Sequence, residues 1–191
     1  PIEEIASLVH GRNPAILLHV DAIQAYGKLV IHPKKQGIDL LSVSAHKFHG
    51  PKGVGFVFID GRVKIHPLLY GGGQQKDLRS GTENVPGIAG MGAAAQEMYT
   101  DHQEKVDYIT GLKDYMIDRM GQLEGVTVNS LKGNQGAPQI VSAGFAGVRS
   151  EVLLHALEEK GIYVSSGSAC SSNHPAISGT LTAIGVKTEL L

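Results

Sequence analysis

Short apolar runs separated by glycine-rich or polar turns characterise the first third of the chain. The runs at 15–20, 38–43 and 54–59 have the length of buried strands, which predicts that they belong to one sheet. Upstream of them, residues 2–10 place apolar side chains on one helical face, and Gly11 is expected to end that helix. The pattern therefore predicts a short amphipathic helix followed by the strands of a single sheet.

A long amphipathic segment follows Asn84, which is a suitable N-cap because Pro86 stands in the first turn after it. Helical spacing then continues to about Met120, which is longer than an ordinary globular helix. We therefore predict one connecting helix over 86–121, between two domains.

The last third of the chain returns to short segments of mixed type. Strands are predicted at 126–129, 138–145 and 162–165, and a helix over 151–160 that Ser150 caps and Gly161 ends. These segments predict a separate, smaller α+β domain over 122–191, while 1–85 belongs to a larger α/β domain.

Composition narrows the class of protein. With 191 residues and 42% hydrophobic content, the chain can bury a sizeable core. A formal charge of −1 provides no basic field for nucleic acid. A single cysteine excludes an internal disulfide framework, and no apolar stretch reaches membrane-spanning length. We therefore expect a cytoplasmic protein that binds neither nucleic acid nor membrane.

The strand predicted at 38–43 leads into Ser44-Ala45-His46-Lys47 and then into a glycine-rich loop at 50–53. Such strand ends in open α/β sheets are where ligands and reactive groups collect. A lysine taken alone is most often a solvated amine, so Lys47 is a candidate only together with other groups. His46 and His49 have a metal-like spacing, but no nearby carboxylate or cysteine completes a ligand set, and no metal site is predicted.

Two further segments supply such groups. Asp21 follows the strand at 15–20 and precedes Gln24. A carboxylate in this position either holds a proton on a heterocyclic nitrogen or caps a turn. Residues 165–172 form a loop of small residues around Cys170, which favours an exposed thiol over the buried, inert one typical of a lone cysteine.

Together these segments resemble the cysteine desulfurases, in class V of the pyridoxal-phosphate-dependent aminotransferase-like enzymes. The matching stretches occur in the family's order, at 19–24, 44–47 with 50–53, 71–73 with 79–82, and 165–172. The Ser-Gly-Ser-Ala-Cys form is similar to that of the group I enzymes. The resemblance implies an α/β fold of fold type I, with part of the cofactor-binding large-domain sheet in 1–85 and a small α+β domain carrying the cysteine loop.

The resemblance also implies a role for each candidate residue. Lys47 forms the link to the aldehyde of pyridoxal 5'-phosphate and removes the α-proton of the substrate, L-cysteine. The other implied cofactor contacts are Asp21 with the pyridinium nitrogen, Gln24 with the ring oxygen, and Ser44 and His46 with the phosphate. Thr82 reaches the phosphate of a neighbouring subunit, which implies a homodimer.

Cys170 is the second catalytic residue that the resemblance implies. Its thiolate attacks the sulfur of L-cysteine, which gives L-alanine and a persulfide that passes to acceptor proteins of iron–sulfur cluster assembly or tRNA thiolation. A selenocysteine lyase or another class V lyase is the alternative enzyme, because the Lys47 and Asp21 segments are shared more widely than the cysteine loop.

The chain resembles only the C-terminal half of the family's usual polypeptide. Its start resembles the helix that follows an Asn-Asn-Glu segment, and it stops just before the place of an arginine that binds the substrate carboxylate. We therefore expect the isolated chain to be inactive. A non-catalytic, truncated fragment is the second alternative.

Overall fold

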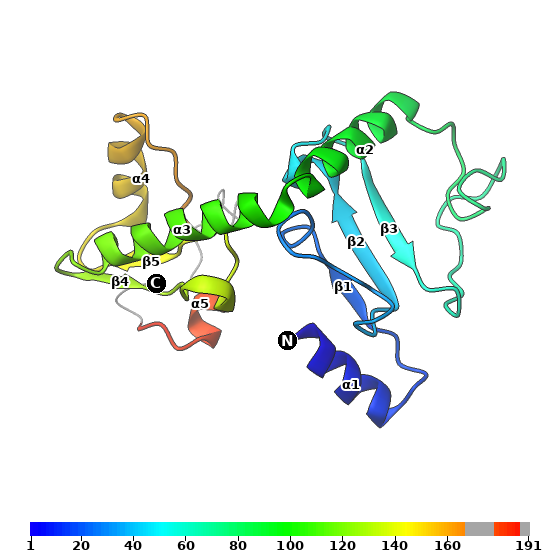
Figure 1. Cartoon of the computed structure of the whole chain (residues 1–191), viewed down its shortest axis with the longest axis horizontal. Helices are drawn as coiled ribbons and strands as arrows, with labels where there is room; N and C mark the ends of the chain where they lie inside the picture. Colours follow the sequence, from blue (N-terminus) through cyan, green and yellow to red (C-terminus); the bar gives the residue numbers. More distant parts are fainter. Residues whose placement is uncertain (167–177, 188–191) are drawn as a thin grey trace. The chain divides into compact units, whose positions relative to one another are not determined.

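The computed structural model describes residues 1–166 and 178–187 (Figure 1). The chain divides into two compact units, 1–105 and 106–191. Cys170 lies outside the described residues.

Three strands form the sheet of the first unit, namely β1 (His19–Asp21), β2 (Leu40–Ser44) and β3 (Gly55–Ile59). β2 lies in the middle, parallel to β1 and antiparallel to β3 (Figure 1). The three predicted strands are confirmed with shifted boundaries. β1 begins late because the Leu18 N–H donates to the Asp39 carboxylate at 2.8 Å, which removes that group from the strand ladder.

The buried core of this unit is built around β2 and the chain that follows it. Its members are Ala22, Ile38, Leu41, Val43, Ala45 and Phe48. Leu41 and Val43 share a face of the strand because side chains alternate along it. Phe48 is at 0% exposure, and the Tyr26 ring packs on it with centroids 4.9 Å apart. Since burying a phenylalanine contributes about 1.5–3 kcal/mol, Phe48 anchors the chain just beyond β2.

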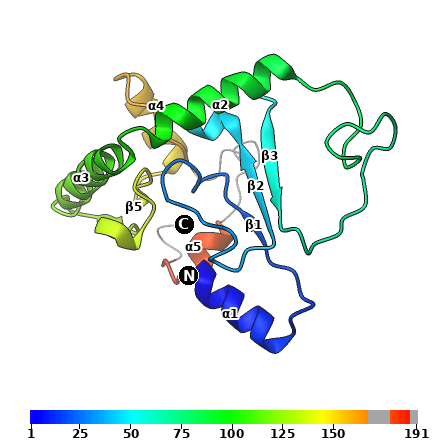
Figure 2. The same cartoon turned by 45° about the vertical axis from the view of Figure 1, so that its right-hand side comes forward.

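α1 (Ile2–Arg12) and α2 (Val85–Tyr99) lie near opposite ends of β2 in both views (Figures 1 and 2). The prediction that Gly11 ends the first helix is wrong, because the helix continues to Arg12. Asn13 ends it instead, with an extended backbone and a side-chain oxygen that accepts from the Ala15 N–H at 2.9 Å.

α2 begins as the sequence predicts. Asn84 caps it by accepting from the Gly87 N–H at 3.1 Å, and Pro86 stands in the first turn. α2 packs against η1 (Ala45–Phe48), a 3-10 helix of one turn that directly follows β2. The helix therefore supports the carboxyl end of the central strand.

The prediction of one helix over 86–121 is wrong, because two helices, α2 and α3 (His102–Met120), occupy this segment. Asp101, between them, has a φ of +49°, a left-handed conformation that a right-handed helix cannot pass through. Thr100 closes α2, and its hydroxyl donates to the Gln96 carbonyl at 2.9 Å. Neither of these helices, nor any other in the described part of the chain, is long and apolar enough to cross a membrane.

The second unit contains the remainder of α3, β4 (Val126–Val128), η2 (Gly133–Gln135), β5 (Ala143–Phe145), α4 (Ser150–Glu158) and α5 (Gly179–Ala183). β4 and β5 pair antiparallel. Lys113 of α3, only 4% exposed, donates to the Gly133 carbonyl at 2.8 Å. The adjacent Asp114 accepts from the Gly133 N–H at 3.0 Å. Both backbone groups of this glycine are thus held by α3.

Two predictions for the second unit are wrong. Residues 162–165 form no strand in the structure, since they are exposed and the Ile162 N–H turns back to the Leu157 carbonyl at the end of α4. Ser150 is the first residue of α4 rather than its cap, and Arg149 precedes it without a side-chain capping bond. The strands predicted at 126–129 and 138–145 exist but are shorter.

Candidate active site

Lys47 lies in η1, directly after β2. Ala45 and Phe48 of the same turn are fully buried, whereas Lys47 is half-buried and His46 is exposed. The Gly50 N–H closes the turn on the Ala45 carbonyl at 2.9 Å, and a Cβ on residue 50 would lie 2.8 Å from the Ala45 Cβ. The backbone of Lys47 is therefore held between two buried neighbours in a turn that requires a glycine at its end.

Asp21 is the last residue of β1, and its Cα lies opposite that of Ser42 on β2. Because β1 and β2 are parallel, Asp21 and the η1 turn belong to the same edge of the sheet, as the strand pattern predicts. Asp21 is exposed, and its Oδ1 accepts from the Ile23 N–H at 2.9 Å. Within the described residues no hydrogen bond or ion pair joins Asp21 to Lys47.

The remaining candidates fall into two groups. Ser44, the last residue of β2, is half-buried, and Gln24 and His46 are exposed on segments at the same edge. Thr82 is exposed on a separate loop that precedes α2, and no hydrogen bond or ion pair of the described part joins it to the others. In residues 1–166 and 178–187 no cluster of histidine, cysteine and acidic side chains is placed to hold a metal ion.

Lys28 was not predicted to belong to this edge. Its amine donates to the backbone carbonyl of Lys47. Burial lowers the pKa of Lys28, and the nearby charge of Lys47 lowers it further. The two lysines are nineteen positions apart, so no local pattern in the sequence could have found the contact.

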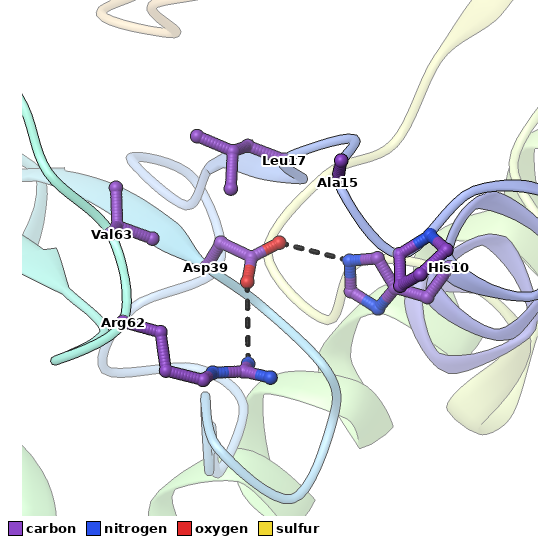
Figure 3. Close-up of a pocket in the computed structure, with 7 residues that line it drawn as sticks. His10, Ala15, Leu17, Asp39, Arg62 and Val63 are labelled. Carbon is purple, nitrogen blue, oxygen red and sulfur yellow. Dashed lines mark hydrogen bonds and ion pairs between the residues drawn. The ribbon is translucent and has the colours of Figure 1, made fainter.

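A second polar cluster lies at the amino end of β2, around Asp39 (Figure 3). Asp39 is 4% exposed, and its Oδ2 accepts from His10 Nε2 at 2.9 Å and from the Leu18 N–H at 2.8 Å. Its Oδ1 faces the Arg62 guanidinium at 3.5 Å. The cluster thus joins α1, the entry to β1 and the loop after β3 through one buried carboxylate.

Arg62 also binds Asp60 at this end, with Nε at 2.8 Å from Oδ1. This hydrogen bond from the Arg62 side chain, and a second from its backbone N–H, lower the pKa of Asp60. A cavity of about 350 Å³ opens beside the cluster, lined by His10, Pro14, Ala15, Leu17, Asp39, Arg62 and Val63 (Figure 3). This cavity is therefore at the opposite end of β2 from Lys47.

Comparisons with known proteins give one consistent result. The family model described as aminotransferase class V matches residues 1–185. A cysteine desulfurase IscS of Dictyoglomus turgidum is 40% identical over 191 residues, which is 100% of this chain and 48% of the relative. A putative cysteine desulfurase IscS 1 of Bacillus subtilis is 42% identical over 186 residues, 96% of this chain and 48% of the relative. The chain thus spans about half the length of these relatives.

Solved structures agree with the sequence relatives. A NifS-like protein superposes with a TM-score of 0.86 at 35% identity and covers 100% of this chain and 48% of its own. A NifS-like protein from Rickettsia africae gives a TM-score of 0.85 at 28% identity, over 99% of this chain and 49% of its own. The fold, the family model and the ordered motifs together show that the chain belongs to the class V aminotransferase family.

Proposed function

We propose that the natural protein containing this chain is a cysteine desulfurase, with Lys47 as the cofactor lysine and Cys170 as the sulfur acceptor. The position of Lys47, in a one-turn helix at the carboxyl end of β2, carries the proposal, because Asp21 ends the adjacent parallel strand. Class V aminotransferases and cysteine desulfurases depend on pyridoxal phosphate, and cysteine desulfurases among the relatives support L-cysteine as the substrate.

The donors at this edge fit that cofactor. Asp21 uses Oδ1 for the Ile23 N–H, which leaves Oδ2 for a protonated ring nitrogen. Ser44 makes no side-chain capping bond in η1, and its hydroxyl is available to a phosphate together with the imidazole of the exposed His46. Lys47 thus offers an amine to the aldehyde of the cofactor, and Asp21 offers a carboxylate to its pyridinium nitrogen. Ser44 and His46 offer hydrogen-bond donors to its phosphate.

Each residue would then have a separate task. When bound, the cofactor ring accepts the electron pair left at the substrate Cα. Asp21 keeps the proton on the ring nitrogen, and Gln24 orients the ring through its oxygen. Lys47 takes the α-proton with its Nζ, which requires the neutral amine. Ser44 and His46 would hold the phosphate of the cofactor and so keep it at the same edge of the sheet as Lys47.

Cys170 would carry out the transfer of sulfur. Its thiolate would attack the substrate sulfur, and the Cβ–S bond of the substrate would break. The bonding electrons would stay with the carbon, which takes up one proton, equivalent to the one lost when the thiol ionised, and becomes the alanine methyl group. Cys170 keeps the sulfur as a persulfide. Support comes from the small residues on both sides of this cysteine in the sequence, which provide little apolar surface for burying a thiol.

The proposal extends to assembly and to the fate of the sulfur. The exposed Thr82 would contact the phosphate bound by a second copy, so the protein would act as a homodimer, with the cofactor-binding domain in 1–85 and the cysteine-bearing domain in 122–191. An acceptor protein of iron–sulfur cluster assembly or of tRNA thiolation would then take the persulfide sulfur. Relatives that are named IscS favour iron–sulfur cluster assembly as the destination of the sulfur.

Borohydride reduction tests the assignment of Lys47. The natural protein, loaded with pyridoxal phosphate, is reduced and digested, and we expect the pyridoxyl group on the Lys47 peptide. A label on Lys52, or no label, would reject Lys47 as the cofactor lysine. The isolated 191-residue chain, assayed in parallel, is expected to form no alanine.

Replacement of the cysteine tests the reaction class. In the natural protein, Cys170→Ser should retain the pyridoxyl label on Lys47 but lose nearly all alanine formation from L-cysteine, because a serine hydroxyl is not ionised at neutral pH. A persulfide mass shift is expected on the wild-type Cys170 peptide alone. Near-normal alanine formation from L-cysteine by the variant would favour another class V lyase. Alanine formation that the variant retains only with L-selenocysteine would favour a selenocysteine lyase.

A further inference from the structure

Lys28 lies on the turn that leaves the carboxyl end of β1 and reaches across to η1. Backbone hydrogen bonds from Lys28 and Leu29 to the Ala25 carbonyl, at 3.0 Å and 2.9 Å, shape this turn. The Lys28 side chain is half-buried, and its amine donates to the backbone carbonyl of Lys47. One side chain thus connects the segment after β1 with the turn after β2.

The turn is itself fixed against the core and α2. Gly27 has a φ of +79°, and a Cβ there would lie 3.3 Å from the Phe48 Cβ, so the backbone passes close to the residue that follows Lys47. The Tyr99 hydroxyl accepts from the Gly27 N–H at 3.2 Å and donates to the Leu29 carbonyl at 3.4 Å. The backbone is therefore held on both sides of Lys28.

A lysine is energetically unfavourable at position 28. Burial lowers the pKa of its amine, and so does the charge of Lys47, which means that the ammonium form is disfavoured there. An apolar side chain of similar length would avoid both penalties. The Lys47 carbonyl is the compensating partner, because a hydrogen bond from a charged donor is stronger than one between neutral groups.

We propose that Lys28 is a positioning residue for Lys47: it ties the Lys47 carbonyl to the turn after β1 and so fixes the backbone from which the Lys47 side chain extends. The consequence for activity rests on the proposed function of Lys47, whereas the contact itself does not. Lys28 touches neither substrate nor cofactor in this role. It acts by limiting the orientations that the Lys47 backbone adopts.

Lys28→Met tests the proposal in the natural protein, because methionine keeps an unbranched, apolar chain and removes the donor. Lys28→Arg restores a charged donor, and Lys64→Met, an exposed lysine of the same unit, is the matched control. In the cofactor-free protein, amide hydrogen exchange of residues 45–50 should rise roughly tenfold in Lys28→Met, as expected for one lost bond to a charged group. Lys28→Arg should restore slow exchange, and Lys64→Met should match the wild type.

Kinetics of the loaded enzyme provide the second measurement. Lys28→Met should lower kcat for L-cysteine with little change in KM, because the substrate still binds while Lys47 is less well placed. Unchanged amide exchange of residues 45–50 in Lys28→Met would overturn the positioning role, whether or not kcat falls. If borohydride labelling fails to find Lys47, the proposed function fails, but the exchange data still decide whether Lys28 holds this turn.

Tyr99→Phe provides an independent variant should Lys28→Met not fold. The ring and its packing remain, and only the hydroxyl that holds Gly27 and Leu29 is removed. Loosening the turn that carries Lys28 should raise exchange in 45–50 by roughly threefold, the effect of a weaker neutral hydrogen bond. Wild-type exchange in this variant would contradict the proposed connection between the two turns.

Discussion

The two ends of β2 carry polar groups of different character. At the amino end, Asp39 is buried and its carboxylate accepts from His10, Leu18 and Arg62. At the carboxyl end, the candidate residues are exposed or half-buried, and the Asp21 and Lys47 side chains are not bonded to each other within the described residues. The Asp39 carboxylate thus uses both oxygens to join three segments, whereas Asp21 makes one hydrogen bond among the described residues and keeps capacity for a ligand.

The strongest test of this comparison removes the amine at the carboxyl end. We expect Lys47→Ala to lower alanine formation from L-cysteine by at least about 10³-fold, because proton transfer by a positioned side chain alone contributes about 10²–10⁴-fold. The free energy of unfolding of the cofactor-free protein should change little, since Lys47 is only half-buried. Turnover near the wild-type level would show that the reaction does not require Lys47 at the carboxyl end of β2.

The second test removes the central carboxylate at the amino end. Asp39→Ala should lower the free energy of unfolding by about 1–3 kcal/mol, because it leaves the half-buried Leu18 N–H and His10 without their acceptor, whereas the exposed Arg62 keeps Asp60. Urea unfolding measures this loss. Below the unfolding transition, kcat for L-cysteine should remain that of the wild type. A kcat that falls while the protein is fully folded would show that the two ends are not independent.

The third and smallest effect concerns pH at the amino end. Hydrogen bonds from Arg62 lower the pKa of Asp60 from its ordinary value of 3.8, so the ionised form is favoured in the folded protein. This stabilisation is present above the unfolded-state pKa and is lost as the pH falls through the lowered, folded-state pKa. Asp60→Asn should therefore reduce stability at pH 7 and flatten its decline as the pH falls below about 3.8, measured by urea midpoints. An equally steep decline in the variant would contradict the assignment.

The carboxyl end was more predictable from the sequence than the amino end. Strands can be predicted from apolar runs, so the position of Lys47 just beyond one strand was found directly. Asp21 was placed at the correct strand end, although it is the last residue of β1 and this strand is largely exposed rather than buried. The amino-end cluster had no such signal, because His10 and Arg62 lie 29 and 23 positions from Asp39. Contacts of that separation depend on how α1 and the loop after β3 fold back, which local patterns do not encode.

The wrong predictions have a common physical origin. Helical spacing across 86–121 did not reveal the left-handed Asp101, because a single aspartate in that conformation costs little and leaves the apolar period nearly intact. Residues 162–165 have a strand-like composition, yet strand formation needs a partner, and these residues are exposed in the structure. Periodicity thus predicted which segments are apolar more reliably than where each helix or strand ends.

The buried amine of Lys113 makes the second unit separately observable. Acylating reagents modify an amine only when solvent reaches it, and this one is enclosed and bound to the Gly133 carbonyl. In a time course of labelling read by mass spectrometry, Lys113 should react only when α3 separates from the loop around Gly133, whereas exposed lysines such as Lys64 should react at once. The rate of Lys113 labelling therefore measures how often α3 separates from the loop around Gly133.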